Sequence, residues 1–271
     1  MAINGKKALD KLIQVLQSLE SVAVGFSGGV DSSVVVAAAS RALGRAKVLA
    51  VTADSETLPA RELEQARALA ARLGTSHAVI ETRELDCAEF VENPADRCFF
   101  CKHELWHRVR SVADERGIKS LADGVNADDL GDHRPGIRAG DEAGVIHPLA
   151  MIGAGKSEVR QLARVLELPN WNKPAQACLS SRFPYGERIT PEGLKRVELA
   201  EEFLHGRGLR QLRVRSHGDI ARIEVTPGEL AGISANGVRG EIVRYFKELG
   251  FRYVTLDLEG FRSGSLNERL D

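Results

Sequence analysis

The chain has 271 residues, and its 37 lysines and arginines nearly balance 38 aspartates and glutamates to give a formal net charge of -1. This near-neutral charge argues against a strongly basic nucleic-acid-binding protein, and a hydrophobic content of 43% argues against a disordered chain. The longest apolar runs fall far short of the roughly 18 residues that span a bilayer. We therefore expect a folded protein with a small-molecule partner, no nucleic-acid partner and no membrane segment.

The first residues of the chain contain neither the apolar stretch nor the small-residue cleavage site of a secretory signal. We therefore expect a cytoplasmic protein whose thiols stay reduced. A chain of this length does not need disulfide bonds for stability. The four cysteines are interpreted by their chemistry instead. Cys98 and Cys101 form a Cys-x-x-Cys pair, whereas Cys87 and Cys178 are isolated in sequence.

The first half of the chain alternates short β-branched runs with longer helical patterns. In chain order the pattern predicts a strand at 22–26, a helix at 31–44, a strand at 47–53, a helix at 59–74, a strand at 77–81, a helix at 102–117, a strand at 120–123 and a helix at 156–168. Such alternation predicts an α/β fold, with a Rossmann-like parallel sheet covered by helices on both faces. Ligands of such sheets bind at the carboxyl ends of the strands.

The second half begins with an irregular, proline-containing segment between Pro169 and Pro191. Thr190 then predicts the start of a helix that runs to about Gly206, with Pro191 at its first position. Strands at 212–215 and 220–225, a helix at 238–249 and a strand at 253–256 follow. We therefore expect a large domain over residues 1–175. Residues 176–271 are expected to form a loop and a smaller α+β domain for substrate binding and oligomerisation.

The segment Ser27-Gly-Gly-Val-Asp-Ser-Ser33 lies between a predicted strand and a predicted helix. Adjacent glycines let backbone N–H groups turn around an anion, and the helix N-terminus adds positive potential. The segment therefore predicts a phosphate site, with an ordinary glycine-rich turn as the alternative. Asp31 could hold a magnesium ion that neutralises a polyphosphate. The nucleotide-binding residues predicted here are Ser27, Gly28, Gly29, Asp31, Ser32 and Ser33.

The Cys-x-x-Cys pair can bind one metal centre, and Cys178 in the irregular segment is the candidate third ligand. Two interpretations stay open. Either His103 or another group completes a zinc site, or three thiolates hold a 4Fe-4S cluster whose fourth iron is open to a substrate atom. A pair of ordinary exposed thiols is the alternative to both.

The glycine-rich segment resembles the PP-loop of the ATP pyrophosphatases, which split ATP between the α- and β-phosphates to adenylylate an acceptor. By this resemblance Asp54, after the second strand, is where the family contacts adenine. Gly124 and Asn126 follow a predicted strand and are expected to contact the nucleotide for the topological reason given above. Asp128, Asp129 and Asp132 are interpreted either as cap and turn residues or as magnesium ligands.

Four further segments resemble the LarE sulfur transferases of nickel-pincer nucleotide biosynthesis, a branch of the PP-loop enzymes. They are residues 123–136, 180–186, 213–218 and 253–264. The resemblance implies adenylylation of a carboxylate of pyridinium-3,5-dicarboxylic acid mononucleotide, followed by replacement of its oxygen with sulfur for the cofactor of lactate racemase. It also implies a homo-oligomer, a hexamer built from trimers.

Some LarE-type members sacrifice the sulfur of one cysteine, and others carry three cysteines and a 4Fe-4S cluster. By resemblance, Cys98, Cys101 and Cys178 place this chain in the cluster group and act in catalysis. Arg182 is expected to offset developing charge on phosphate and carbonyl oxygens, with surface solvation as the alternative. The expected cofactors are ATP, Mg²⁺ and a 4Fe-4S cluster.

Glu201, Arg213 and Arg215 resemble the family's set of residues for the substrate phosphate. Arg213 and Arg215 are two apart on a predicted strand, so both guanidinium groups face one side and can fork around a phosphate. A polar outer strand face is the alternative. Three other functions compete with sulfur transfer by a cluster: tRNA thiolation, sacrifice of the Cys178 sulfur, and nucleotide binding without catalysis.

Overall fold

The computed structural model describes residues 5–131 and 135–262, which form two compact units. The first unit combines the residues up to Glu84 with Asp96–Gln176, and the second combines Leu85–Ala95 with the residues from Ala177 onward. Asp132 and residues 133–134 and 263–264 of the motif segments lie outside the described residues. No helix in the described part of the chain is long and apolar enough to cross a bilayer.

The first unit contains a five-stranded parallel sheet in the order β3-β2-β1-β4-β5, which confirms the expected α/β fold. The strands are β1 (Val22–Gly25), β2 (Val48–Asp54), β3 (Ser76–Glu81), β4 (Ser120–Ala122) and β5 (Val145–Ile146). Because β1 lies between β2 and β4, the strand order reverses beside β1. The carboxyl ends of β1 and β4 therefore form the topological switch point at which such sheets bind ligands.

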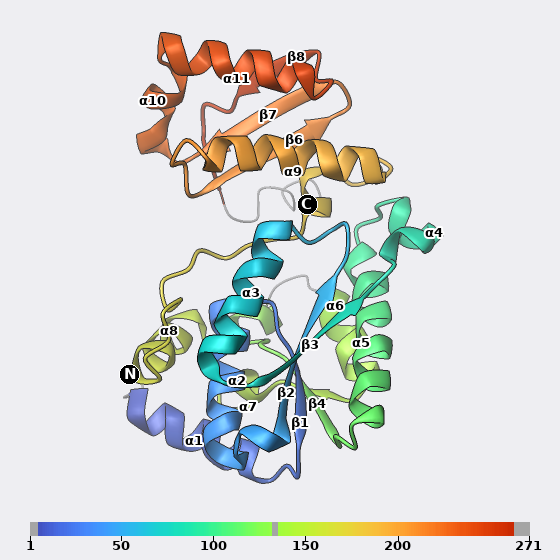
Figure 1. Cartoon of the computed structure of the whole chain (residues 1–271), viewed down its shortest axis with the longest axis vertical. Helices are drawn as coiled ribbons and strands as arrows, with labels where there is room; N and C mark the ends of the chain where they lie inside the picture. The colour runs from blue at the N-terminus through green and yellow to red at the C-terminus, as the bar shows by residue number, and fades with distance from the viewer. Residues whose placement is uncertain (1–4, 132–134, 263–271) are drawn as a thin grey trace. The chain divides into compact units, whose positions relative to one another are not determined.

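Helices cover both faces of this sheet (Figure 1). They are α1 (Gly5–Gln17), α2 (Val30–Leu43), α3 (Ala60–Leu73), α5 (Arg97–Glu115), α6 (Pro135–Glu142), α7 (Pro148–Met151) and α8 (Lys156–Val165), with short 3-10 turns at Arg45–Lys47, Glu84–Asp86 and Ala127–Gly131. Helices α1, α2, α3 and α8 lie on one side, and α5 and α6 on the other. Alternate residues of β1 point to opposite faces of the sheet, since Val24 packs with helices α1, α2, α3 and α8 and Ala23 packs with α5.

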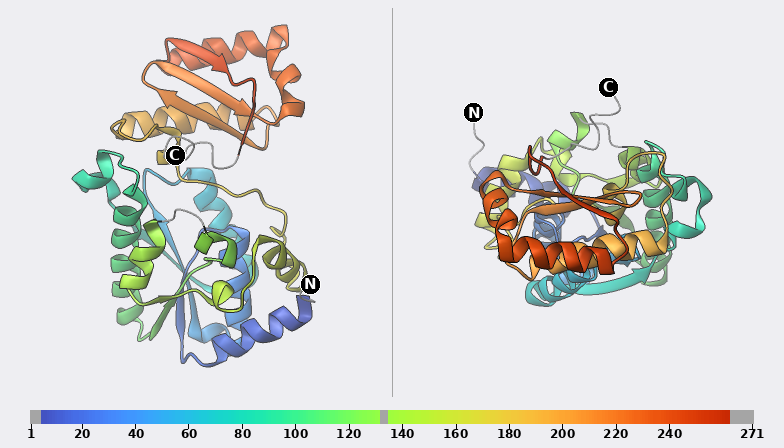
Figure 2. Two further views of the ribbon diagram at one scale, coloured as in Figure 1. Left: turned by 180° about the vertical axis from the view of Figure 1, so that it is seen from behind. Right: turned by 90° about the horizontal axis from the view of Figure 1, so that it is seen from above.

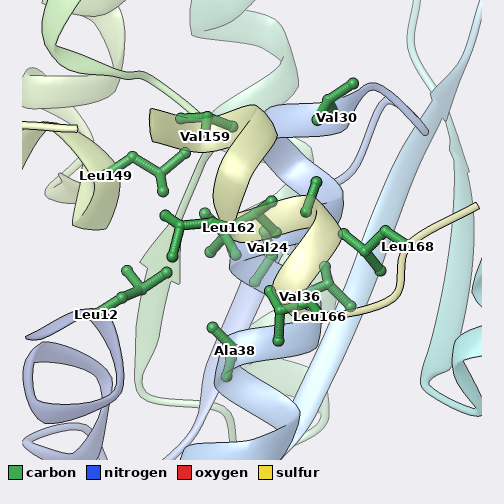
Figure 3. Close-up of a cluster of buried hydrophobic side chains, with 14 of the residues drawn as sticks. Leu12, Val24, Val30, Val36, Ala38, Leu149, Val159, Leu162, Leu166 and Leu168 are labelled. Atoms are coloured by element: carbon green, nitrogen blue, oxygen red, sulfur yellow. The ribbon is translucent and has the colours of Figure 1, made fainter. Parts of the chain in front are cut away.

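The core between the sheet and the helices on the side of α1 and α2 is made mainly of aliphatic side chains (Figure 3). Leu12 of α1, Val36 of α2, Leu149 of α7 and Leu162 of α8 converge on Val24 of β1, and all five are fully buried. This packing fixes the start of α2 against the end of β1. The segment that joins them is the predicted phosphate loop.

Helix α5 begins at Arg97, five positions before the predicted start. Cys98 and Cys101 therefore lie on the helix and not ahead of it, which corrects the expected boundary. Asp96 is the N-cap residue, although its side chain makes no capping hydrogen bond.

The second unit contains a three-stranded mixed sheet in the order β6-β7-β8, where β6 and β7 are antiparallel and β7 and β8 are parallel. Its strands and helices are β6 (Leu212–His217), β7 (Ile220–Val225), β8 (Tyr253–Leu256), α4 (Ala88–Val91), α9 (Pro191–His205), α10 (Leu230–Ser234) and α11 (Asn236–Glu248), with 3-10 turns at Leu179–Arg182 and Pro227–Glu229. Figure 2 shows the two long helices α9 and α11 beside the strands. The smaller α+β fold is confirmed.

The start of α9 is the predicted one, because the Thr190 hydroxyl accepts a hydrogen bond from the N–H of Gly193 at 3.0 Å. The segment Leu85–Ala95 belongs to this unit through Asn93. The Asn93 amide donates to the carbonyl oxygens of Pro184 at 2.7 Å and Glu187 at 3.0 Å. A piece of chain from the first half thus stabilises the loop that precedes α9.

Candidate functional site

The predicted phosphate loop connects β1 to α2 at the switch point of the sheet. Gly28 has a φ of +68°, and a Cβ at this position would come within 3.1 Å of the Cα of Ala66 in α3. Both constraints require glycine. Gly29 is the N-cap of α2 and has no side chain, so no N-cap side chain competes with an anion for the first N–H groups of the helix.

The serine hydroxyls of the loop bond mainly to the loop itself. The Ser33 hydroxyl donates to the Gly29 carbonyl at 2.6 Å, and the Ser32 hydroxyl lies 3.3 Å from the Ser27 hydroxyl and 3.3 Å from the same carbonyl. Ser32 and Ser33 are buried and Ser27 is exposed. Ser27 is therefore the hydroxyl best placed to meet a ligand from solution, while the other two hold the loop in shape.

Asp31, in the first turn of α2, accepts a hydrogen bond from the amide of Asn126 at 2.8 Å. The Asn126 amide oxygen in turn accepts from the N–H groups of Asp128 at 3.0 Å and Asp129 at 3.3 Å, so both ends of this buried side chain are bonded. Burial raises the pKa of Asp31 above its ordinary value. A half-buried carboxylate of this kind favours a bound cation, which would compensate its charge.

Gly124 brings the end of β4 directly against α2. A Cβ at Gly124 would come within 2.6 Å of the Ser32 nitrogen and 2.9 Å of the Asp31 carbonyl carbon. The structure thus brings the predicted residues Gly124 and Asn126 together with the start of α2. Asp54 lies exposed at the carboxyl end of β2, on the same edge of the sheet.

The acidic residues after Asn126 have structural partners. The Asp128 carboxylate accepts from the N–H of Lys156 at 2.7 Å and so caps the N-terminus of α8. Asp129 lies 3.6 Å from the ammonium of Lys156. For Asp128 the geometry therefore favours the cap role over the magnesium role.

Cys98 and Cys101 lie one helical turn apart on α5, where residues three positions apart share a face. Cys98 is exposed, and the half-buried Cys101 thiol donates to the Glu84 carboxylate at 3.7 Å. Cys178 belongs to the second unit, whereas the pair belongs to the first. Among residues 5–131 and 135–262, no group of three or more His, Cys, Asp or Glu side chains is arranged to hold a metal ion.

Cys178 is the N-cap of the 3-10 turn Leu179–Arg182, and its carbonyl oxygen accepts several hydrogen bonds. It accepts from the Ser181 N–H at 3.0 Å, the Ser181 hydroxyl at 2.8 Å and Nη1 of Arg182 at 3.0 Å. Arg182 also donates to the Ala177 carbonyl at 2.8 Å. The backbone around Cys178 is therefore held from several directions.

Arg182 is buried, and its guanidinium forms a two-point hydrogen bond with Glu201 of α9, at 2.8 and 2.7 Å. Burial opposes ionisation of Glu201, but the charge and hydrogen bonds of Arg182, the hydrogen bond from the Val214 N–H and the charge of Arg213 together lower the Glu201 pKa. Arg182 was expected to offset charge on a substrate. Its donors face Glu201 and the Cys178 loop instead, an arrangement that the sequence did not indicate.

Arg213 and Arg215 are both buried on β6, so the alternative of a polar, solvent-exposed strand face is wrong. Arg215 donates two hydrogen bonds to Glu224 at 3.0 Å and one to the Ser181 carbonyl at 2.7 Å. Burial, followed by the repulsion of nearby Arg182, lowers the pKa of Arg213 to about 10. The nearby carboxylates of Glu201 and Glu224 act in the opposite direction.

Two residues that the sequence did not single out support the phosphate loop. The Thr52 hydroxyl donates to the Phe26 carbonyl, just before Ser27, at 2.6 Å, and lies 2.8 Å from Nε2 of His77. Because this hydroxyl has one proton, Nε2 of His77 must be the donor. Asn170, from the irregular segment after α8, bonds to the loop directly, with 3.1 Å from its amide nitrogen to the Gly28 carbonyl. No local sequence signal marks either contact.

The chain is similar to known proteins over nearly its whole length. The family model of NAD synthase matches residues 4–116. A protein of Lactiplantibacillus plantarum named pyridinium-3,5-bisthiocarboxylic acid mononucleotide synthase is 39% identical over 259 residues, which cover 96% of this chain and 93% of that protein. An uncharacterized protein of Synechocystis sp. is 46% identical over 262 residues, 97% of each chain.

A tRNA-specific 2-thiouridylase of Bacteroides fragilis is 33% identical over 122 residues, which cover 41% of this chain and 33% of that enzyme. This match leaves most of both proteins unpaired, whereas the match to the mononucleotide synthase runs through both units. The chain therefore belongs to the family of pyridinium-3,5-bisthiocarboxylic acid mononucleotide synthases, the LarE-type enzymes of the PP-loop superfamily.

Proposed function

We propose that this chain is an ATP-dependent sulfur transferase that acts on pyridinium-3,5-dicarboxylic acid mononucleotide. It adenylylates a carboxylate of this substrate, releases pyrophosphate, and replaces the activated oxygen with sulfur. The thiocarboxylates formed serve the nickel-pincer nucleotide of lactate racemase. The observation that carries the proposal is the uncapped glycine-rich loop at the switch point, with Asp31 and Asn126 beside it. The near full-length similarity to a synthase of that product supports it.

In the first step the substrate carboxylate attacks the α-phosphorus of ATP. A new oxygen–phosphorus bond forms as the bond to the β-phosphate breaks, and pyrophosphate leaves. The loop from Ser27 to Ser33 would bind the phosphates through its N–H groups, and Asp31 would hold Mg²⁺ against them. The acyl adenylate has a good leaving group, AMP, where the carboxylate had none. Gly124 and Asn126 line the nucleotide, and Asp54 lies at the adenine.

We infer that the second unit binds the phosphate of the mononucleotide substrate. Arg213 and Arg215 share one face of β6, and the depressed pKa of Arg213 supports an anion site there. Glu201 is part of the same proposed set of residues, and it accepts a hydrogen bond from Arg182. In this proposal Arg182 is a positioning residue, because its hydrogen bonds fix the backbone of Cys178.

Cys98, Cys101 and Cys178 are proposed to hold a 4Fe-4S cluster. The chemistry of the donors fits, since thiolates are the usual cluster ligands and two of these residues share one helix face. The cluster, when bound, would supply a sulfide as the nucleophile. The helix presents Cys98 and Cys101, and the bonded carbonyl of Cys178 keeps its loop in place. We further propose that the enzyme is cytoplasmic and assembles as a homo-hexamer.

The test combines turnover and metal analysis on protein purified without oxygen and reconstituted with iron and sulfide. With ATP, Mg²⁺ and the mononucleotide, we expect pyrophosphate release and a thiocarboxylate product by mass spectrometry. About four irons per chain, lost in Cys98→Ala and kept in the matched control Cys87→Ala, would support the cluster. No iron uptake, with conversion of Cys178 to dehydroalanine, would establish sacrifice of its sulfur. Thiolation of tRNA without reaction of the mononucleotide would refute the proposed substrate.

A further inference from the structure

We propose that Asn170 is a positioning residue that sets the phosphate loop for nucleotide binding; the inference rests on the proposed function. Asn170 follows α8 in the irregular segment and contacts the loop from a position 142 residues away in sequence. Its amide nitrogen donates to the Gly28 carbonyl at 3.1 Å and to the Ser33 hydroxyl at 3.0 Å. One side chain thus touches both ends of the loop.

The directions of these hydrogen bonds are fixed by chemistry. A backbone carbonyl can only accept, so the NH₂ group of Asn170 must face Gly28. The Ser33 hydroxyl gives its single proton to the Gly29 carbonyl at 2.6 Å, so it must accept from Asn170. Asn170 therefore holds the Gly28 carbonyl directly and the Gly29 carbonyl through Ser33.

Fixing these two carbonyls also fixes the N–H groups of the loop. Each peptide group is planar and trans, so its carbonyl and its N–H point in opposite directions. The Gly28 carbonyl shares a peptide with the Gly29 N–H, and the Gly29 carbonyl shares one with the Val30 N–H. When Asn170 and Ser33 hold the carbonyls on one side, the two N–H groups turn to the other. There the Gly29 N–H lies 3.3 Å from the exposed Ser27 hydroxyl.

The position of Asn170 is itself fixed by the fold. Three residues further on, the Lys173 ammonium lies 2.7 Å from the Glu62 carboxylate, and both side chains are largely buried. Glu62 is in the first turn of α3, and Ala66, one turn later, is the residue that Gly28 packs against. The irregular segment is therefore anchored both to the loop and to the helix behind it. Asn172, between the two anchors, is exposed.

The test is calorimetric binding of MgATP to the full chain carrying Asn170→Ala, the isosteric Asn170→Asp, or the matched control Asn172→Ala. Loss of two neutral hydrogen bonds predicts a Kd for ATP that rises roughly 5- to 20-fold in both Asn170 variants and is unchanged in Asn172→Ala. In turnover, the KM for ATP should rise while the KM for the mononucleotide stays constant. A merely structural role would not change the KM for ATP while leaving the KM for the mononucleotide constant.

A double-mutant cycle with Ser33→Ala tests the route through Ser33. The combined loss of ATP affinity should be smaller than the product of the two single losses, because both changes break the same chain of hydrogen bonds. Wild-type affinity in both Asn170 variants would overturn the inference and leave the proposed function standing. Failure of the wild-type protein to bind ATP would overturn the proposed function itself.

Discussion

The guanidinium of Arg182 and the carboxylate of Glu201 meet in a parallel two-point contact, with nitrogen–oxygen distances of 2.8 and 2.7 Å. The Arg182 side chain is 1% exposed and that of Glu201 is 7% exposed, so water compensates neither charge. Glu201 also accepts from the Val214 N–H at 2.9 Å. This pair links the Cys178 loop, helix α9 and strand β6, and it makes the loop dependent on the core of the second unit.

Substitution Arg182→Met should therefore destabilise the protein strongly. It leaves the Glu201 carboxylate buried without its counter-ion, which costs about 3–5 kcal/mol of the free energy of unfolding. Urea denaturation of the full chain would measure the loss. The double substitution of Arg182→Met with Glu201→Leu should recover much of it, because no unpaired charge remains. A single variant as stable as wild type would contradict this account.

Asp31→Asn should raise stability while abolishing turnover. Burial raises the pKa of Asp31, so the folded state disfavours the ionised carboxylate that exists at neutral pH. An uncharged amide removes that cost and can still pair with Asn126, so Tm should increase. Pyrophosphate release should fall by about 100-fold or more, because the charge that we propose holds Mg²⁺ is lost. A lower Tm at pH 7 would show that the carboxylate is not destabilising.

Gly124→Ala should damage the proposed nucleotide site without altering any polar group. The added methyl would lie 2.6 Å from the backbone nitrogen of Ser32, so the first turn of α2 must shift. We expect a loss of about 1–3 kcal/mol in stability, together with weaker ATP binding in a titration. Gly232→Ala is the control, since none of the described heavy atoms lies within 4 Å of the Cβ it adds. Equal effects of the two substitutions would argue against the close approach.

His147 should make stability depend on pH. Its ring nitrogens lie 2.7 Å from Asp123 and 3.1 Å from Asp141, and both partners are carboxylate oxygens, which favour the doubly protonated ring. The hydrogen bond to Asp123 raises the pKa of His147 above the ordinary histidine value of 6.5. Its contribution to stability is thus complete below about pH 6.5 and disappears as the pH rises through the raised pKa.

The measurement compares His147→Asn with wild type in thermal unfolding at pH 6 and pH 9. The difference in Tm should be larger at pH 6. His107→Asn, at an exposed histidine of α5, serves as the control. A larger difference at pH 9 would have the wrong sign and would exclude a charged His147.

Much of the fold could be predicted because it is encoded locally. Strands β7 and β8 begin and end at the predicted residues, since β-branched runs bounded by turn residues mark them. Helix α3 ends at Gly74, whose φ of +62° only glycine adopts readily. Strand β5 was not predicted, because two residues, Val145 and Ile146, are too few to form a periodic pattern. Its place in the sheet depends on pairing with β4.

The candidate site, like the fold, could be predicted only where it is encoded locally. The loop from Ser27 to Ser33 is contiguous in sequence, so its glycines and helix start could be recognised there. The contacts that hold it come from distant segments, as with Asn170 and the Asp128 cap of α8, which joins residues 28 positions apart. Such contacts depend on which elements the sheet topology brings together. A single sequence contains no direct signal of that arrangement.

Because Leu85–Ala95 packs in the second unit, its folding depends on residues that are synthesised much later. This segment leaves the ribosome early, but its packing partners begin at Ala177. Until they are made, Phe90 and Val91, which are 2% and 7% exposed in the finished fold, have nowhere to pack. A chain ending at Gln176 would carry the same two apolar side chains uncovered in the connection between β3 and α5, and such a fragment should aggregate.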